Sequence, residues 1–195
     1  MAHLDTGATY RAVTLLALRR GIDLADDDAL AELARGMDIR MVPAGERVGV
    51  LLDGLDVTDE IRTEAVSANS RHAAASPAVR EVLVELQRRL GRQLGSFVTE
   101  GRDQGSVVFP DADVKFYLDA RASERARRRC QELRSHGQQA DRDAVLAAIE
   151  DRDRHDRTRA VGPLRVPGGA TVIDTSDMDI AQVTERMLQY VRAPR

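Results

Sequence analysis

Cysteine and aromatic residues are scarce in this chain of 195 residues. The one cysteine, Cys130, excludes an intramolecular disulfide and a cysteine-based zinc site. Aromatic residues make up 3% of the sequence, and tryptophan is absent. Single-stranded nucleic acids bind largely by stacking their bases on aromatic side chains. The composition therefore argues against an arginine-rich RNA-binding protein, and we expect no nucleic-acid partner.

Long apolar runs and common metal or nucleophile motifs are absent as well. No run of about 18 apolar residues could span a membrane, and the first residues lack the basic-then-apolar pattern of a signal peptide. We therefore expect a cytoplasmic protein without a membrane partner. The four histidines have no H-E-x-x-H spacing and no G-x-S-x-G occurs, so neither a zinc site nor acyl transfer is expected.

Lysine occurs once, at Lys115, and the sequence contains no G-x-x-x-x-G-K-[ST] loop. In such a loop, backbone N–H groups and the lysine hold the phosphates of a nucleotide. Arginine makes up the rest of the 29 basic residues, in a chain of net charge −3. Genome composition explains most of this excess. Arginine's planar fork nevertheless binds phosphate oxygens two at a time, so clusters of it are candidate phosphate sites.

The apolar pattern predicts an α/β fold in a single domain, which suits the length of the chain. Strands that alternate with helices indicate a parallel sheet covered by helices on both faces. A first helix would begin at Thr6 and end at Gly21, and a later one would begin after Ser76 with Pro77 in its first turn. Between them, the Asp53-Gly54 turn signal predicts a small antiparallel sheet. The predicted helices are 6–21, 26–36, 77–90, 123–135, 141–154 and 180–191, and the predicted strands are 39–42, 48–52, 55–57, 97–99, 114–118 and 171–173.

A charged loop follows the predicted strand at 97–99, with the sequence Glu100-Gly101-Arg102-Asp103. Open α/β folds bind their ligands at the carboxyl edge of the sheet, where this loop would lie. Arg102 can grip a phosphate, and Asp103 can accept a hydrogen bond from an exocyclic amine or a hydroxyl. The alternative is an ordinary solvated turn.

Two helical segments carry further charged clusters. Arg152, Asp156 and Arg159 recur at i, i+4 and i+7, so they share a helix face on which a carboxylate lies between two arginines. That arrangement suits a phosphorylated sugar, although alternating Arg and Asp is more often a surface ladder of ion pairs. A second cluster, on the helix after the strand at 114–118, comprises Arg125, Arg128 and Arg129.

Three stretches in the right order resemble motifs of the bacterial cytidylate kinases. They are His3 to Arg11, Gly101 to Ala112 and Arg152 to Leu164, and the resemblance extends over essentially the whole chain. It implies a P-loop kinase-like fold with a monophosphate-binding insert at about 37–95 and a lid at about 125–160. It also implies transfer of the γ-phosphoryl group of ATP to CMP or dCMP, with Mg²⁺, by a cytoplasmic monomer.

The resemblance also implies roles for individual residues. Arg11 and Arg102 would hold the acceptor phosphate beside Thr6, while Arg80 and Asp103 would read the cytosine edge. Asp156 and Arg152 would bind the ribose, and Arg159 would reach the phosphates. The lid arginines would be Arg125, Arg128 and Arg129, and Arg11, Arg102, Arg152 and Arg159 would be catalytic.

The sequence departs from the family pattern at one position of the acceptor site. The serine that contacts cytosine in the family aligns with Arg71, and Ser70 stands immediately before it. Either a shift in register supplies Ser70, or the selection of the base is altered.

A larger departure concerns the donor side. The family's first strand, its Walker A loop and most of the following helix, about 25 to 30 residues, have no counterpart in this sequence. The resemblance therefore predicts no protein ligand for Mg²⁺ in this chain and makes its activity doubtful. Two explanations follow: a start site placed inside a normal kinase, or a catalytically inactive relative that binds cytidine nucleotides or serves a regulatory role.

Overall fold

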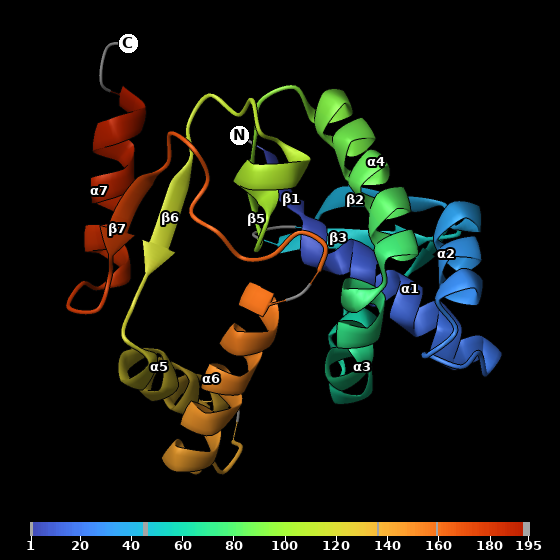
Figure 1. Ribbon diagram of the computed structural model, residues 1–195, viewed down its shortest axis with the longest axis horizontal. Coiled ribbons are helices and arrows are strands. Elements are labelled where there is room, and N and C mark those ends of the chain that lie inside the picture. Colours follow the sequence, from blue (N-terminus) through green and yellow to red (C-terminus); the bar gives the residue numbers. More distant parts are fainter. Residues whose placement is uncertain (1, 45–46, 136, 159, 193–195) are drawn as a thin grey trace. The chain divides into compact units, whose positions relative to one another are not determined.

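The computed structural model describes residues 2–44, 47–135, 137–158 and 160–192 (Figure 1). The chain forms two compact units, Met1–Phe109 and Pro110–Arg195. Among the described residues, the first unit contains two sheets and four α-helices, and the second contains one sheet and three α-helices. The single-domain prediction, with its insert and lid, stays a prediction.

The elements of the first unit follow the predicted helices and strands closely. The additions are a strand at its start, a helix before Ser76, and two short helical turns after Asp59 and Asp103. The elements are β1 (Ala2–Asp5), α1 (Thr6–Arg20), α2 (Asp27–Gly36), β2 (Ile39–Ala44), β3 (Arg47–Leu52), β4 (Leu55–Asp56), the 3₁₀ turn η1 (Glu60–Arg62), α3 (Glu64–Ala75), α4 (Pro77–Leu94), β5 (Phe97–Glu100) and the π-helical turn η2 (Gln104–Val108).

Local capping signals explain where the helices of this unit begin. Ser76 caps α4, because its side chain accepts a hydrogen bond from the N–H of Val79, and Pro77 occupies the first turn. Helix α1 differs from the prediction by one residue. Its cap is Asp5, which accepts from the N–H of Ala8, and Thr6 is its first residue. A carboxylate can cap a helix as well as a hydroxyl can, and Thr6 uses its hydroxyl elsewhere.

The small antiparallel sheet is confirmed, with strand order β2-β3-β4. Asp53 and Gly54 join β3 to β4 and have φ angles of 50° and 82°. Two successive positive φ angles are typical of the turn that matches the twist of a hairpin, and Asp-Gly is well suited to it.

The parallel strands form two separate pairs instead of the one predicted sheet. Strand β1 pairs with β5, from Ala2 opposite Phe97 to Asp5 opposite Glu100. The second pair lies in the other unit. Exposure alternates along β5, where Val98 is 52% exposed, so one face of this pair is covered, not both. A two-residue alternation of this kind indicates a half-buried strand.

The main hydrophobic core lies within the first unit. It is built around the buried face of α1, the end of β1, and the apolar faces of α2 and α4. The periodicity of Val79, Leu83, Leu86 and Leu90 along α4 confirms the predicted apolar stripe of that helix. Burial of these side chains packs α1 and α4 beside β1 and β5. The charged loop with Arg102 and Asp103 follows the carboxyl end of β5.

The second unit has fewer buried residues. Its elements are β6 (Phe116–Asp119), α5 (Ala122–Ser135), α6 (Arg142–Thr158), β7 (Thr171–Asp174) and α7 (Ile180–Arg192). Strands β6 and β7 pair in parallel, and Figure 1 shows α7 beside them. Helix α5 buries Ala126 and Cys130, whereas α6 and α7 contain no buried residue in the part of the chain described.

Lys115 connects the two segments that lead into β6 and β7. Its Nζ donates to the carbonyl oxygens of Pro110 and Gly168, the latter at 3.1 Å, and its own carbonyl oxygen accepts from the N–H of Thr171. The chain's one lysine thus joins the segment before β6 to the segment before β7. No helix among the described residues is long and apolar enough to cross a membrane.

Candidate functional site

The loop after β5 places Arg102 and Asp103 at the carboxyl end of the β1–β5 pair, as predicted. The carbonyl oxygen of Asp103 accepts from the N–H of Val107 at 2.8 Å, which closes the turn η2 and fixes the backbone at Asp103. Gly101 lies tightly against this turn, since a Cβ there would meet Gln104 Cγ at 2.8 Å. Arg102 is exposed, while Asp103 is buried.

Arg80 and Asp103, the predicted base-reading residues, meet in a buried ion pair. Arg80 Nη2 donates to Asp103 Oδ2, and the two side chains are 2% and 6% exposed. Arg80 Nη1 lies 3.4 Å from the carbonyl oxygen of Ala74, and its guanidinium carbon lies 5.8 Å from the centre of the Tyr10 ring. Arg80 Nε has no hydrogen-bond partner among the described protein groups. The pair is therefore rigid and closed to bulk water.

Arg11 and Thr6 project from the first two turns of α1 in the same unit. Arg11 Nη1 donates to Ser67 Oγ at 2.6 Å and to the carbonyl oxygen of Ile61 at 3.3 Å, which ties α1 to α3. Thr6 Oγ1 donates to the carbonyl oxygen of Glu100 at 2.8 Å. A hydroxyl has one proton to donate, so Thr6 would have to leave this bond before donating to a phosphate.

A buried polar chain connects α4 to this first turn of α1. Gln87 Nε2 donates to Thr9 Oγ1 at 2.9 Å, and Thr9 Oγ1 donates to the carbonyl oxygen of Thr6 at 2.7 Å. Gln87 is fully buried, and its Oε1 has no hydrogen-bond partner among the described protein groups. The chain holds Thr6 against the end of β5, where Arg102 and Asp103 begin.

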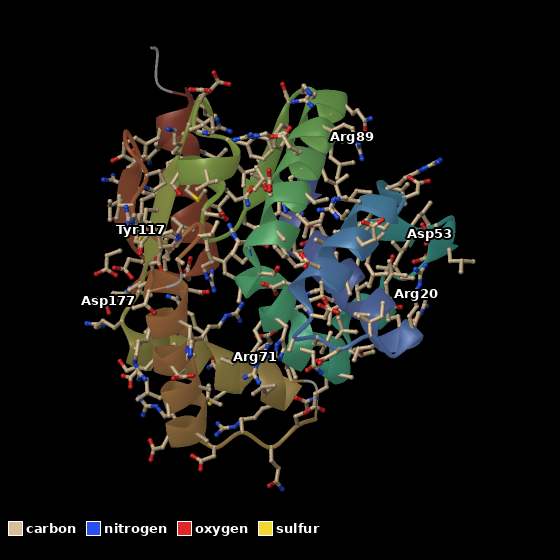
Figure 2. All side chains as sticks on the ribbon, turned by 45° about the vertical axis from the view of Figure 1, so that its right-hand side comes forward. Arg20, Asp53, Arg71, Arg89, Tyr117 and Asp177 are labelled. Atoms are coloured by element: carbon tan, nitrogen blue, oxygen red, sulfur yellow. The ribbon has the colours of Figure 1, made fainter. Side chains whose placement is uncertain are left out.

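Helix α3 carries both alternatives for the base-contacting position, and the choice between them stays a prediction. Ser70 Oγ donates to the carbonyl oxygen of Ser67, one turn back in the same helix, at 3.0 Å. Arg71 is exposed, and the described residues offer it no hydrogen bond or ion pair. Figure 2 labels Arg71 on α3.

The lid arginines of the second unit are engaged with nearby groups. Arg125 makes a two-pronged ion pair with Asp153 of α6, at 2.9 and 2.6 Å, and this carboxylate raises the pKa of the Arg125 guanidinium. Arg128 Nε donates to Glu124 at 2.8 Å and Arg128 Nη2 to the carbonyl oxygen of Met178 at 3.1 Å. Hydrogen bonds from Arg127 and Arg128 lower the pKa of Glu124 to about 2.

The remaining predicted residues lie on or near α5 and α6. Arg129 pairs with Glu132 at 2.7 Å on the surface of α5. Arg152 Nε lies 3.9 Å from Asp156 Oδ2, one turn along α6, with Arg152 72% and Asp156 16% exposed. This confirms that the two residues share a helix face. Arg159 lies outside the described residues.

Several contacts of the site escaped the sequence analysis. Ser67 accepts a hydrogen bond from Arg11, the ring of Tyr10 lies near the guanidinium of Arg80, and Gln87 donates to Thr9. The two residues of each pair are far apart in the sequence, and Ser67, Tyr10 and Gln87 had not been singled out as site residues. The resemblance at Ser70 and Arg71 connected this segment with the site, but it gave no sign that Ser67 contacts Arg11. Within the described parts of the chain, no group of three or more His, Cys, Asp or Glu side chains could hold a metal ion.

Comparison with known proteins assigns this arrangement to a family. A family model described as cytidylate kinase matches residues 1–193. A cytidylate kinase of Rhodococcus opacus is 50% identical over 97% of this chain and 82% of its own length. Those of Vibrio cholerae and Escherichia coli K12 are 44% and 45% identical over 97% of this chain, and over 84% and 83% of their own lengths. These matches do not test the roles of individual residues or the expected loss of a first strand and Walker A loop, which stay predictions.

Proposed function

The chain belongs to the cytidylate kinase family, and from this premise we propose that it transfers the γ-phosphoryl group of ATP to CMP and dCMP, giving CDP and dCDP. It is a nucleoside monophosphate kinase, and the comparisons do not favour the alternative of an inactive regulatory relative. The donor would enter as the Mg²⁺ complex of ATP. The cytoplasmic location and the monomeric state remain proposals.

The observation that carries the proposal is the buried pair of Arg80 and Asp103. Carboxylates accept hydrogen bonds from the exocyclic amine of cytosine, and uracil lacks this donor. Asp103 is held by Arg80 and by the backbone of η2, so its carboxylate is fixed in position where the base would enter. Such preorganised groups contribute to recognition because they need no reorganisation when the ligand binds.

The phosphate end of the acceptor would lie at Arg11 and Arg102. Both are arginines of the first unit, one on α1 and one in the loop that also carries Asp103. The bonds of Arg11 to Ser67 and Ile61 have neutral partners. A phosphate dianion is a stronger acceptor than either, so Arg11 can exchange them for the acceptor phosphate.

The ribose and the donor phosphates would be bound by residues of α5 and α6. Asp156 is mostly buried and can accept from a ribose hydroxyl, with Arg152 beside it. Arg125, Arg128 and Arg129, together with Arg159, would neutralise the transferring phosphoryl group. We place these residues in a lid of about residues 125–160 and the base-binding residues of α3 and α4 in an insert of about 37–95.

Phosphoryl transfer needs little covalent help from the protein. Its transition state spreads negative charge over the oxygens of the transferring group, and catalysis consists mostly of alignment and neutralisation of that charge. The Mg²⁺ that accompanies ATP would supply part of this neutralisation. The rest would come from Arg11, Arg102, Arg152 and Arg159, together with the lid arginines Arg125, Arg128 and Arg129.

The direct test is to incubate the purified chain with Mg²⁺, ATP and one nucleoside monophosphate, and to quantify the diphosphate by anion-exchange chromatography. We expect CDP and dCDP to form faster than UDP. The variant Asp156→Asn should lower kcat/KM for CMP about 10- to 100-fold, in line with the loss of charged hydrogen bonds. Glu150→Gln, an exposed carboxylate on the same helix, is the matched control and should change nothing. Absence of CDP with the unmodified chain would contradict the proposal.

A further inference from the structure

Arg88 of α4 binds the end of the turn η2 with its guanidinium. Its Nε donates to the carbonyl oxygen of Val108 at 3.0 Å, and its Nη2 donates to that of Val107 at 2.9 Å. These two nitrogens form one edge of the guanidinium, so the arginine binds both oxygens with a planar fork. The remaining nitrogen, Nη1, donates to Glu85 at 2.7 Å, one turn back on the same helix. The guanidinium of Arg88 is therefore fixed in direction by protein groups on all three of its nitrogens.

Hydrogen bonds within η2 connect this contact to Asp103. The carbonyl oxygen of Asp103 accepts from the N–H groups of Ser106, Val107 and Val108, at 3.3, 2.8 and 3.3 Å. The last carbonyl groups of a helical turn have no partner within the turn itself. Arg88 supplies the partner for two of them. The backbone of Asp103 is thus bonded to a turn whose other end is held by Arg88.

Helix α4 contacts η2 and its flanking residues at both ends. Arg80 binds the carboxylate of Asp103 at the start, and Arg88 binds the carbonyl groups at the end. The two arginines are eight residues apart, which is about 12 Å along a helix axis. Beyond them, Gly91 lies close to the residue after the turn, since a Cβ there would meet Phe109 Cε1 at 3.0 Å. One helix therefore sets the position of the whole segment from Asp103 to Phe109.

We propose that Arg88 is a positioning residue for the acceptor nucleotide, which acts through η2 to hold Arg102 and Asp103 in place. This inference rests on the proposed function, because it takes Arg102 and Asp103 as the residues that bind CMP. Arg88 does not touch the nucleotide, since its guanidinium nitrogens are bonded to protein groups. Without the fork, η2 would sample more conformations, and CMP would have to order the loop as it binds. That ordering lowers the affinity for CMP.

A purely structural role for Arg88 predicts a different result. Arg88 and Glu85 are 36% and 64% exposed, and ion pairs at that exposure contribute little to stability. Among the described residues, the main core includes neither Val107 nor Val108. We therefore expect loss of Arg88 to loosen η2 locally. A purely structural arginine would lower the free energy of unfolding and leave the affinity of the folded chain for CMP unchanged.

The first test is isothermal titration of the full chain and its variants with CMP. Arg88→Met keeps most of the apolar stem and removes the fork, and we expect the Kd for CMP to rise about 10-fold, the lower end of the effect of one charged hydrogen bond. Arg88→Lys should recover part of this loss, because an ammonium group keeps the charge and can still donate to a carbonyl oxygen. Urea denaturation of each variant shows that the chain is folded under the conditions of the titration.

Two variants of α4 serve as matched controls. Glu85→Gln removes the ion pair of Arg88 but leaves both of its bonds to carbonyl oxygens. Arg89→Met removes the same charge as Arg88→Met from the next position, which is exposed and labelled in Figure 2. Both should keep the Kd for CMP within about twofold of that of the unmodified chain, as is usual for exposed substitutions.

The second test needs no nucleotide and follows the backbone of η2 itself. The N–H groups of Val107 and Phe109 donate to the carbonyl oxygens of Asp103 and Gln104. In Arg88→Met, hydrogen exchange at these two N–H groups, measured by NMR, should be about 10-fold faster or more, because exchange reports local opening. Exchange in the middle of α1 should not change.

Two results would overturn the inference while the unmodified chain still binds CMP and forms CDP. An unchanged Kd for CMP in folded Arg88→Met would reduce Arg88 to a structural residue, and unchanged exchange at Val107 and Phe109 would show that η2 does not depend on it. If Arg88→Met does not fold, Arg88→Lys gives the same comparison with a smaller expected change. If the unmodified chain binds no CMP and forms no CDP, the proposed function fails and the positioning role fails with it, even where exchange in η2 responds to Arg88.

Discussion

The two units of the chain hold their charged residues in contrasting ways. In the first unit, Arg80 and Asp103 are buried and paired beside the main core. In the second unit, Arg125 and Arg129 lie on a helix surface with exposures of 34% and 51%. The carboxylates that pair with them come from the same helix or the next one.

This difference indicates a division of labour in the proposed kinase. A buried pair cannot reorganise cheaply, so it is suited to recognising one base in a fixed geometry. Exposed ion pairs contribute little to stability and exchange their partners readily. The arginines of α5 are therefore suited to leaving carboxylates for phosphates when a nucleotide binds. The predictions below test how far this contrast holds.

The largest effect is expected from breaking the buried pair. Asp103→Ala leaves the Arg80 guanidinium buried without its carboxylate, and such losses typically cost about 3–5 kcal/mol of unfolding free energy. Urea denaturation followed by circular dichroism would measure it. The double variant Arg80→Met with Asp103→Leu should recover most of the stability but not the phosphorylation of CMP. A loss below about 1 kcal/mol in Asp103→Ala would remove the contrast between the units.

A smaller effect is expected at the hydroxyl of Thr6. Thr6→Val keeps the shape of the side chain but leaves the carbonyl oxygen of Glu100 without its donor, which should cost about 1–2 kcal/mol of unfolding free energy. Thr6→Ser retains the hydroxyl and should lose less. If the hydroxyl serves the acceptor phosphate instead, Thr6→Val would raise KM for CMP and leave the urea midpoint unchanged.

The half-buried ion pair of Arg125 and Asp153, which joins α5 to α6, should contribute less again. Asp153→Asn removes the carboxylate that faces Arg125, and we expect a loss of about 1 kcal/mol or less, falling as salt is added. Thermal unfolding at low and high ionic strength would show the dependence. A loss of unfolding free energy as large as that of Asp103→Ala, and independent of salt, would mean that the Arg125–Asp153 pair stabilises the fold as much as the buried pair does.

The smallest effect concerns the acid sensitivity of α5. The pKa of Glu124 lies at about 2, below its ordinary value of 4.5, because Arg127 and Arg128 donate to its carboxylate. The folded chain thus binds this proton less readily than the unfolded chain. The stabilisation is fully present above pH 4.5 and is lost as pH falls toward about 2. In Glu124→Gln, the free energy of unfolding should depend less on pH between about 2 and 4.5. Urea denaturation followed by circular dichroism at several pH values would measure this dependence. The same dependence in the variant and the unmodified chain would contradict the assignment.

Local signals in the sequence predicted the elements well. Ser76 with Pro77, the Asp53-Gly54 turn and the apolar stripe of α4 each specify the backbone over a few residues, and each is confirmed. The cap of α1 was wrong by one residue, because Asp5 and Thr6 are both good capping residues and the contact of Thr6 with Glu100 lies outside the local sequence. Contacts between residues close in the sequence could therefore be predicted, whereas contacts with distant residues, which decide between two possible caps, could not.

The sequence allowed us to name candidate site residues, but it did not show which of them contact one another. The ion pair of Arg80 and Asp103 joins α4 to a loop, and the bond of Arg11 to Ser67 joins α1 to α3. Nothing in the spacing of these residues specifies that they meet, because tertiary packing of α1, α3 and α4 brings them together. The division of the parallel strands into two pairs was missed for the same reason.

The attachment of Lys115 between the segments before β6 and β7 has a practical consequence for labelling. Since no other lysine occurs in the sequence, an amine-reactive dye has a single side chain to modify, and the arginines of both units stay untouched. The reagent must first displace the carbonyl oxygens of Pro110 and Gly168 from the ammonium group. The rate of acylation at Lys115 Nζ, separated from that of the N-terminal α-amino group by peptide mapping, would thus report how often the ammonium group leaves these two carbonyl oxygens. Acylation there would place a probe on the second unit and remove its only lysine charge.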